Sequence, residues 1–302
     1  MYFHRLVDKM SAIASPSIRK LAMEKGIDLD ELAKKLGREQ IAREDLEQKV
    51  IKAEPVKEQP GPRNYWDVDH ELWGEIEIQP IGRIPKIAID NLTAAHQTIP
   101  VVTHHDSADV SRLEKFRNVL KKEGKRITPL AFHVAILSKC LKIFPKFNAS
   151  ISSDCKSMIL KKYVNISIAV DTEVGLLVPV IRNADKLTIS QISEAIVDLA
   201  GRARNAELKT HDMGGASMTI SSLGGIGGEG FTPIVNPPEV AILGLTKTKV
   251  CPVWNGSEFI PTPMVPIDLT YDHRLINGAD AARFVNYYID LLKSPAELIL
   301  DQ

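Results

Sequence analysis

Hydrophobic residues recur at helical spacing in four stretches of the chain. Within residues 279–292 the apolar positions, among them Phe284 and Tyr288, repeat every three or four residues, which predicts an amphipathic helix. Residues 129–143 are apolar on nearly every side, which predicts a buried helix. The other two helices are predicted over residues 111–122 and 190–206.

Alternation with a period of two indicates the strands. Residues 163–170 (YVNISIAV) are rich in β-branched side chains and alternate towards their end, as a half-buried strand does. Further strands are predicted over residues 217–223, 239–245 and 264–269. Helices and strands in this mixed order predict a two-layer α/β domain, here assigned to residues 76–302.

Residues 13–50 predict a small helical domain. Ser15 is a suitable cap for a helix that begins at Pro16, and Gly26 can end it. A second helix is predicted over residues 41–51.

Residues 51–75 predict a linker, because Pro55, Pro60 and Pro62 lie among polar residues and favour an extended chain. Trp73, together with Tyr65 and Trp66, is unusual for a free linker. Part of this segment is therefore expected to pack on the domain that follows.

Composition and charge exclude several classes of protein. Lysine and arginine number 38, as do aspartate and glutamate, so the formal net charge is zero and no nucleic-acid partner is expected. The chain has no apolar run long enough to span a membrane and no secretory signal core at its start. Cys140, Cys155 and Cys251 lack metal-ligand spacing. We therefore expect no metal site, and packing thiols in a cytoplasmic protein.

Residues 271–279 (YDHRLINGA) carry the most chemical information. His273 follows an apolar, strand-like run and precedes a turn glycine and the predicted helix, with Asn277 four residues later. An imidazole at a strand-to-loop junction can act as a general base. The alternatives are a surface histidine in a turn, and an asparagine that only starts the helix.

Residues 225–230 (GIGGEG) fit the G-x-G-x-x-G pattern of dinucleotide-binding proteins. The prolines that follow, Pro233, Pro237 and Pro238, exclude the helix whose N-terminus would bind a pyrophosphate. No dinucleotide site is predicted.

Together with residues 271–279, four further motifs resemble the dihydrolipoamide acyltransferases, the catalytic cores of the 2-oxo acid dehydrogenase complexes. The resemblance covers about residues 76–302, is closest to bacterial pyruvate dehydrogenase acetyltransferases, and implies a chloramphenicol acetyltransferase-like fold. The motifs are LKIFPKFNAS (141–150), KKYVNISIAVDTEVGLLVP (161–179), MGGASMTISSLGGIGG (213–228) and FTPIVNPPEVAILGL (231–245).

The resemblance implies acyl transfer, most simply of acetyl, between the thiols of dihydrolipoamide and coenzyme A. A thiol with a pKa of about 8.5 is mostly protonated at neutral pH, so attack needs a base, and the resemblance assigns His273 to this role. It assigns Ser221 as the donor to the tetrahedral oxyanion, with ordinary strand-end hydrogen bonding as the alternative.

Two further residues have roles by resemblance. Arg117 is expected to contact coenzyme A, with an exposed, solvating arginine as the alternative. Asn277 stands where many relatives have aspartate, so it can support the catalytic loop only through neutral hydrogen bonds.

Residues 13–50 resemble the peripheral subunit-binding domain of the same family, through ASPSIRKLA (14–22) and IAREDL (41–46). Residues 31–38 (ELAKKLGR) depart from the family's glycine-rich basic loop, which contributes to docking of partner enzymes. Decarboxylase or dihydrolipoyl dehydrogenase components are the candidate partners, and a helical hairpin that binds neither is the alternative.

Lys9 faintly matches a lipoylation site, but too few residues precede it to form a lipoyl domain. We therefore expect no covalently bound lipoyl group on this chain, and a lipoyl group supplied in trans, for example by lipoyl-bearing acyltransferase chains. The alternatives are a non-catalytic core or accessory subunit of a 2-oxo acid dehydrogenase complex, and acyl transfer to another small thiol, amine or alcohol.

In the family the active site lies between subunits of a trimer, which implies a homotrimer here. Relatives assemble trimers into cubes or dodecahedra through apolar C-terminal residues. Residues 298–300 (LIL) could serve, but Asp301 and Gln302 follow, and burying a terminal charge is costly. We expect assembly to stop at the trimer, and sedimentation as a cube-sized particle would contradict this.

Overall fold

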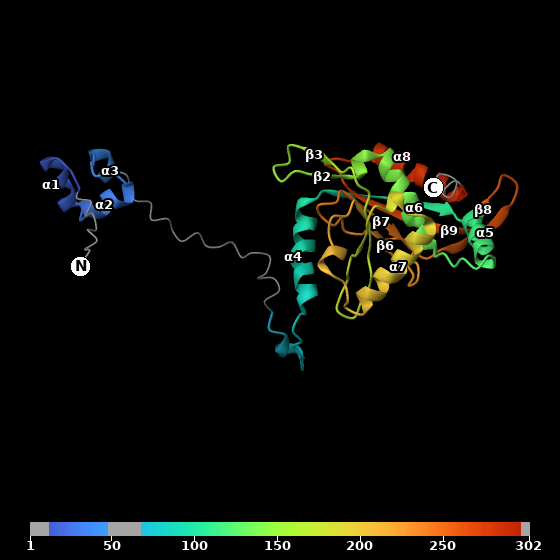
Figure 1. Cartoon of the computed structure of the whole chain (residues 1–302). Helices are drawn as coiled ribbons and strands as arrows, with labels where there is room; N and C mark the ends of the chain where they lie inside the picture. Colours follow the sequence, from blue (N-terminus) through green and yellow to red (C-terminus); the bar gives the residue numbers. More distant parts are fainter. Residues whose placement is uncertain (1–11, 48–67, 297–302) are drawn as a thin grey trace, which may run out of the picture. The chain divides into compact units, whose positions relative to one another are not determined.

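The computed structural model describes residues 12–47 and 68–296. The chain divides into two compact units, Met1–Ile78 and Gln79–Gln302 (Figure 1). The predictions that concern Lys9, the Tyr65–Trp66 pair and residues 298–302 lie outside the described residues.

In residues 12–47 of the first unit the structure describes three short helices, α1 (Pro16–Glu24), α2 (Leu29–Leu36) and α3 (Arg43–Glu47). Ser15 caps α1 as predicted, its hydroxyl accepting the Ile18 N–H at 3.4 Å.

Helix α2 occupies the stretch for which no helix was predicted. The carboxylate of Asp28 caps its start, and Gly37 ends it in the left-handed conformation that glycine adopts readily. After the undescribed segment, His70–Trp73 form a 3-10 turn in which Trp73 is exposed.

One mixed sheet organises the second unit. Strands β4, β6 and β7 are parallel to one another, and all other pairings are antiparallel. The spatial order is β1 (Val101–Asp109), β9 (Phe259–Asp272), β7 (Ala241–Leu245), β6 (Met218–Ser222), β4 (Ile166–Ile168) and β5 (Val180–Ile181), with β8 (Lys249–Trp254) pairing to the first half of β9. A separate hairpin consists of β2 (Ala149–Ile151) and β3 (Met158–Leu160).

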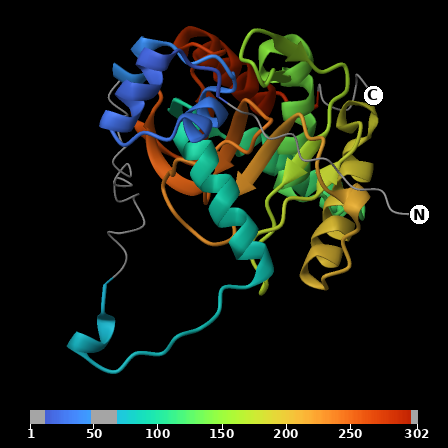
Figure 2. The same cartoon turned by 90° about the vertical axis from the view of Figure 1, so that its left-hand side faces the viewer.

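The four predicted helices are confirmed, each to within two residues. Their bounds are α5 (Ser111–Lys122), α6 (Pro129–Ile143), α7 (Ile189–Arg204) and α8 (Gly278–Lys293). A fifth helix, α4 (Arg83–Thr98), was not predicted. Figure 2 shows α4 crossing in front of the sheet.

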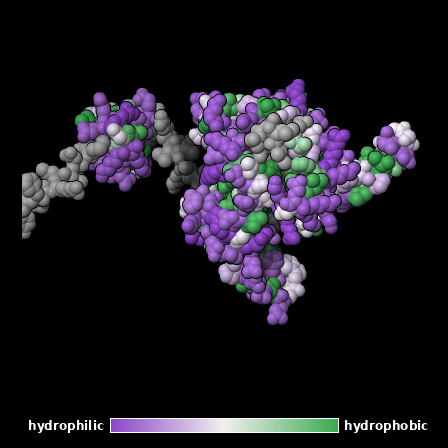
Figure 3. Space-filling view, turned by 45° about the vertical axis from the view of Figure 1, so that its right-hand side comes forward, coloured by the Kyte–Doolittle hydropathy of each residue, from purple (hydrophilic) through white to green (hydrophobic). Residues whose placement is uncertain are grey.

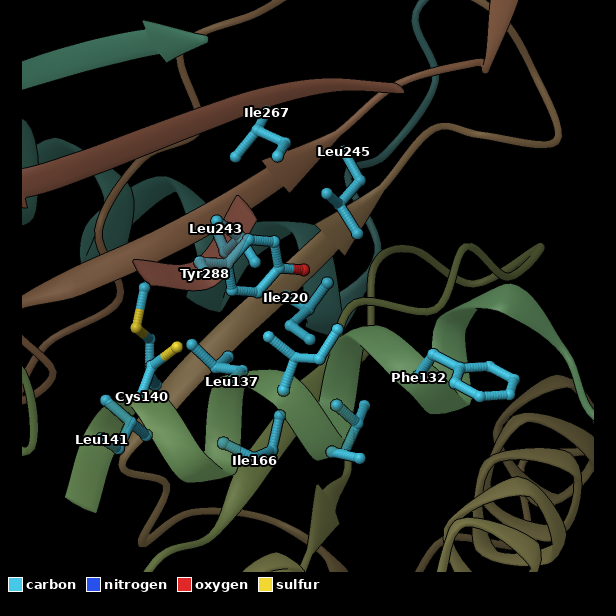
Figure 4. Close-up of a cluster of buried hydrophobic side chains, with 14 of the residues drawn as sticks. Phe132, Leu137, Cys140, Leu141, Ile166, Ile220, Leu243, Leu245, Ile267 and Tyr288 are labelled. Carbon is cyan, nitrogen blue, oxygen red and sulfur yellow. The ribbon is translucent and has the colours of Figure 1, made fainter. Parts of the chain in front are cut away.

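The main core lies between the sheet and helices α5 to α8 (Figure 4). Alternate sheet residues such as Ile220, Leu243 and Ile267 face it, and α6 is buried along most of its length, as predicted. The predicted two-layer α/β architecture is therefore confirmed. Of the three cysteines only Cys140 is a buried packing thiol, so that prediction is wrong for Cys155, which is exposed, and for Cys251, which is half-buried.

The opposite side of the sheet, here called the polar face, carries hydroxyl and carboxyl groups. Ser167 and Thr219 share a hydrogen bond of 2.6 Å, and the Thr219 hydroxyl also donates to buried Glu239 at 2.7 Å. A small apolar cluster of Ala95 on α4 with Ile99, Val235 and Ile242 covers part of this face.

The hairpin of β8 and β9 projects from the second unit. Val250, Trp254 and Phe259 on it are exposed, and Figure 3 shows hydrophobic groups on this projection against a mostly hydrophilic surface. A large apolar patch of this kind is typical of surfaces that bind another protein.

Candidate active site

The predicted base, His273, is the first residue after the long strand β9. Its backbone N–H donates to the carbonyl oxygen of Pro100 at 3.0 Å, and its exposed ring lies against that of Tyr271 with centroids 6.0 Å apart. Within the described residues neither ring nitrogen has a hydrogen-bond partner. The imidazole is thus free to accept a proton from an incoming group.

An ion pair between exposed Arg274 and the buried carboxylate of Asp272 fixes the turn that carries His273. Asp272 is 2% exposed, and its carboxylate accepts hydrogen bonds from the Arg274 guanidinium at 2.6 and 2.9 Å and from the Arg274 backbone N–H at 3.0 Å. These bonds raise the pKa of Arg274. This pair was not predicted from the sequence, although the motif carries opposite charges on the two sides of the histidine.

Asn277 is the N-cap of α8. Its side-chain oxygen accepts the Asp280 N–H at 2.8 Å, which starts the helix as a cap does. Among the described residues it makes no hydrogen bond to His273, so in one chain it acts on the histidine only by fixing the turn between them.

Ser221 lies near the end of β6 on the polar face. It is half-buried, and its hydroxyl has no hydrogen-bond partner within the described part of the chain. Ser222, the next residue, points to the helical side and lines a cavity there. The hydroxyl of Ser221 is therefore available to a ligand.

Within one chain Ser221 and His273 do not meet. Ser221 is in register with Gly244, and Gly244 with Asp268, so about 10 Å across two strand spacings separates Ser221 from β9. His273 lies five residues farther along, about 17 Å at roughly 3.4 Å per residue. The two side chains are thus about 20 Å apart, too far to act on one carbonyl group.

Arg117 lies on α5 at the edge of a cavity of about 570 Å³, here called the Arg117 cavity. Its guanidinium makes two hydrogen bonds to Glu114, at 2.7 and 2.8 Å, and one to the Ile127 carbonyl at 3.2 Å. Lys121 and Arg126 also line the cavity, so it has an excess of positive charge that suits a phosphate group.

A second cavity, of about 450 Å³, adjoins the first and is here called the Ser222 cavity. The two share Thr128 and Pro129. His133 on α6 lines it, hydrogen-bonded through Nδ1 to the buried hydroxyl of Tyr288. Burial, with a contribution from the charge of Arg117, lowers the pKa of His133 to about 4. This histidine was not predicted as a site residue, because it lies inside an apolar helix.

A third cavity, of about 1000 Å³, lies beside α4 and the turn at residues 172–175, and none of the predicted site residues lines it. In the described ranges there is no cluster of three or more histidine, cysteine or acidic side chains that could hold a metal ion. None of the described helices is long and apolar enough to cross a membrane. The glycine-rich residues 225–230 form a loop with no helix after them, as predicted.

Comparisons with known proteins agree on one family. The model of the 2-oxoacid dehydrogenases acyltransferase (catalytic domain) matches residues 74–300. A curated relative from Haemophilus influenzae, the dihydrolipoyllysine-residue acetyltransferase component of pyruvate dehydrogenase complex, is 42% identical over 96% of this chain and 55% of its own length. The chain spans about half the length of such relatives.

Solved structures give the same result. One, from work on the role of a serine, a histidine and an asparagine in the catalytic mechanism of Azotobacter vinelandii dihydrolipoamide acetyltransferase, is 45% identical with a TM-score of 0.74, covering 76% of this chain and 97% of that one. Another, the cubic core of the pyruvate dehydrogenase multienzyme complex, is 46% identical with the same TM-score and the same coverage.

Proposed function

Because the chain belongs to the 2-oxoacid dehydrogenase acyltransferase family, we propose that it transfers an acetyl group between coenzyme A and dihydrolipoamide. The observation that carries the proposal is a spacing. In the Azotobacter enzyme the histidine follows the serine by 52 residues, and the asparagine follows the histidine by four. Ser221, His273 and Asn277 have the same two spacings, and each lies at the end of a strand or the start of a helix.

The proposed chemistry uses His273 as the base. Its imidazole takes the proton from the attacking thiol, the sulfur bonds to the thioester carbon, and the carbonyl oxygen becomes an oxyanion to which the Ser221 hydroxyl donates. When the original carbon–sulfur bond breaks, the imidazolium returns the proton to the departing thiol. A base of this kind is worth about 10² to 10⁴ in rate and a hydroxyl donor about 10² to 10³. Asn277 and the Asp272–Arg274 pair act by holding the histidine turn.

We propose that coenzyme A binds along the helical side. The Arg117 cavity, with its three cations, suits the phosphorylated nucleotide. The adjoining Ser222 cavity suits the pantetheine arm, because it extends from Thr128 to the end of β6, where the thiol would pass the end of the strand to the Ser221 hydroxyl on the polar face. Arg117 would share its guanidinium between Glu114 and a phosphate.

The separation of about 20 Å between Ser221 and His273 supports a site built from two copies of the chain. We therefore propose a homotrimer in which one copy supplies the histidine and its neighbour the serine. The exposed apolar residues of the β8–β9 hairpin are a surface that such contacts would cover. The lipoyl group is proposed to arrive in trans, from a separate lipoyl-bearing chain.

Acetyl transfer from acetyl-CoA to free dihydrolipoamide tests the proposal, with His273→Ala and Ser221→Ala measured beside the wild type. We expect both variants to lose at least about 100-fold in kcat, with unchanged thermal unfolding. Ser190→Ala is the control, since it removes an exposed hydroxyl on α7 that lines neither of the two cavities. A folded, oligomeric wild type without transfer activity would contradict the proposal and favour the accessory-subunit alternative.

A further inference from the structure

Four residues form a straight row across the polar face. Ser221 on β6, Gly244 on β7, Asp268 on β9 and His105 on β1 are successive register partners, so their side-chain positions lie on one face, about 5 Å apart from strand to strand. Of these four residues only Ser221 has a role in the proposed reaction. Gly244, Asp268 and His105 form the part of the sheet next to it.

Asp268 holds a loop onto this row. It is 2% exposed. One carboxylate oxygen is hydrogen-bonded to Nδ1 of His105 at 2.6 Å, and the other accepts a hydrogen bond from the backbone N–H of Phe231 at 3.0 Å. A buried carboxylate is costly unless its oxygens are hydrogen-bonded, so these two partners allow Asp268 to occupy the site.

Phe231 lies on Gly244. A Cβ atom at position 244 would be 2.9 Å from Cε1 and 3.0 Å from Cζ of the Phe231 ring, closer than carbon atoms can approach. The ring therefore fills the space that the missing side chain leaves. Since Gly244 is the strand neighbour of Ser221, the ring edge lies about one strand spacing, roughly 5 Å, from Ser221.

We propose that Asp268 and His105 are positioning residues that hold the Phe231 ring as the side wall of the Ser221 site. The proposal rests on the proposed acetyl transfer. A fixed aromatic wall keeps water from the acyl group and strengthens the hydrogen bond from Ser221 to the oxyanion. Without it, water can compete with the thiol: its oxygen bonds to the thioester carbon, the carbon–sulfur bond breaks, and acetate and free coenzyme A result.

The test compares Asp268→Leu with Asp268→Asn. Leucine cannot accept the Phe231 N–H, whereas asparagine can accept it and donate to His105. For Asp268→Leu we expect a fall in transfer kcat of about tenfold or more, a similar rise in the ratio of acetyl-CoA hydrolysis to transfer, and a KM for coenzyme A within about twofold of wild type. Asparagine is expected to restore all three values.

His105→Leu provides a milder variant, because the His105 side chain is 59% exposed and the hydrogen bond from the Phe231 N–H to Asp268 does not involve it. The same changes are expected on a smaller scale. Glu229→Gln is the matched control: it removes an exposed ion pair with Lys249 from the same loop and should change neither ratio nor kcat. If Asp268→Leu loses kcat with an unchanged ratio of hydrolysis to transfer, its role is only structural and the proposal is wrong.

Amide hydrogen exchange separates this proposal from the proposed function. The Phe231 amide should exchange faster in Asp268→Leu than in wild type and Asp268→Asn, whether or not the protein transfers acetyl groups. A wild type without activity contradicts the proposed function. Unchanged exchange of the Phe231 amide in Asp268→Leu overturns the proposal that Asp268 holds Phe231 in place.

Discussion

Two buried groups with opposite pKa shifts should make the stability of this protein nearly independent of pH from about pH 5 to 6.5. Burial lowers the pKa of His133 to about 4 from its ordinary 6.5. Burial also raises the pKa of Glu239 to about 7 from 4.5. In this range the folded protein keeps His133 neutral and Glu239 protonated, whereas the unfolded chain charges both.

The two effects have opposite signs. Unfolding lets His133 take up a proton, so its contribution makes the free energy of unfolding rise with pH by about 1.4 kcal/mol per unit. Unfolding lets Glu239 release a proton, so its contribution makes the free energy of unfolding fall by about the same amount. As the pH is raised from about 5 to 6.5, the free energy of unfolding of Glu239→Gln should therefore rise by about 2 kcal/mol. That of His133→Gln should fall by about 2 kcal/mol over the same range.

Urea unfolding at four pH values across this range, at one protein concentration, measures these slopes. The double variant is the control and should be as flat as wild type. The pKa values of the other carboxylates with resolved shifts, Asp154, Asp212 and Glu229, are all lowered, so these groups titrate below this range. If the free energy of unfolding of either single variant does not change with pH, these two groups are not the source of the opposing pH dependences.

Three further changes test the packing, each followed by thermal or urea unfolding. Gly244→Ala should destabilise by about 1–3 kcal/mol, because its Cβ would overlap the Phe231 ring; an unchanged midpoint would place that ring elsewhere. Asn277→Ala should cost about 1 kcal/mol through loss of the α8 cap, and Asn277→Asp should cost much less. Phe284→Ala should cost about 3–5 kcal/mol, because its buried ring stacks on Phe147 with centroids 4.2 Å apart; a loss under 1 kcal/mol would mean that this cluster repacks.

The helices that pack on the sheet could be predicted because their buried positions are apolar and regularly spaced. Helix α4 was missed, although its apolar positions repeat at helical spacing much as those of α5 do. In the folded chain Ile87, Ile89 and Leu92 are exposed and the one fully buried residue is Ala95, so the core of one chain does not account for that pattern.

Strand β1 escaped prediction because most of its residues are polar. Its residues on the polar face, Thr103 and His105, pair with Thr270 and Asp268 through hydrogen bonds, so the expected apolar alternation is missing. Strand β4 is shorter than its β-branched sequence suggested, since only residues 166–168 enter the ladder. Burial of polar side chains depends on partners that are distant in sequence.

For the site, sequence identified the residue types but not their arrangement. His273 and Ser221 each lie where the pattern placed them, after β9 and on β6. Their separation depends on the strand order and register, which a single chain does not encode locally. The same long-range pairing places Asp268 beside His105, so no local motif could have indicated it.

The distance between Ser221 and His273 has a genetic consequence. If each site takes these residues from different copies, two inactive alleles should complement each other when expressed together. In randomly mixed closed rings of Ser221→Ala and His273→Ala chains, about one site in four combines an intact serine with an intact histidine. A heterozygous cell would recover activity that neither allele provides alone, and one defective allele would impair the products of a healthy one.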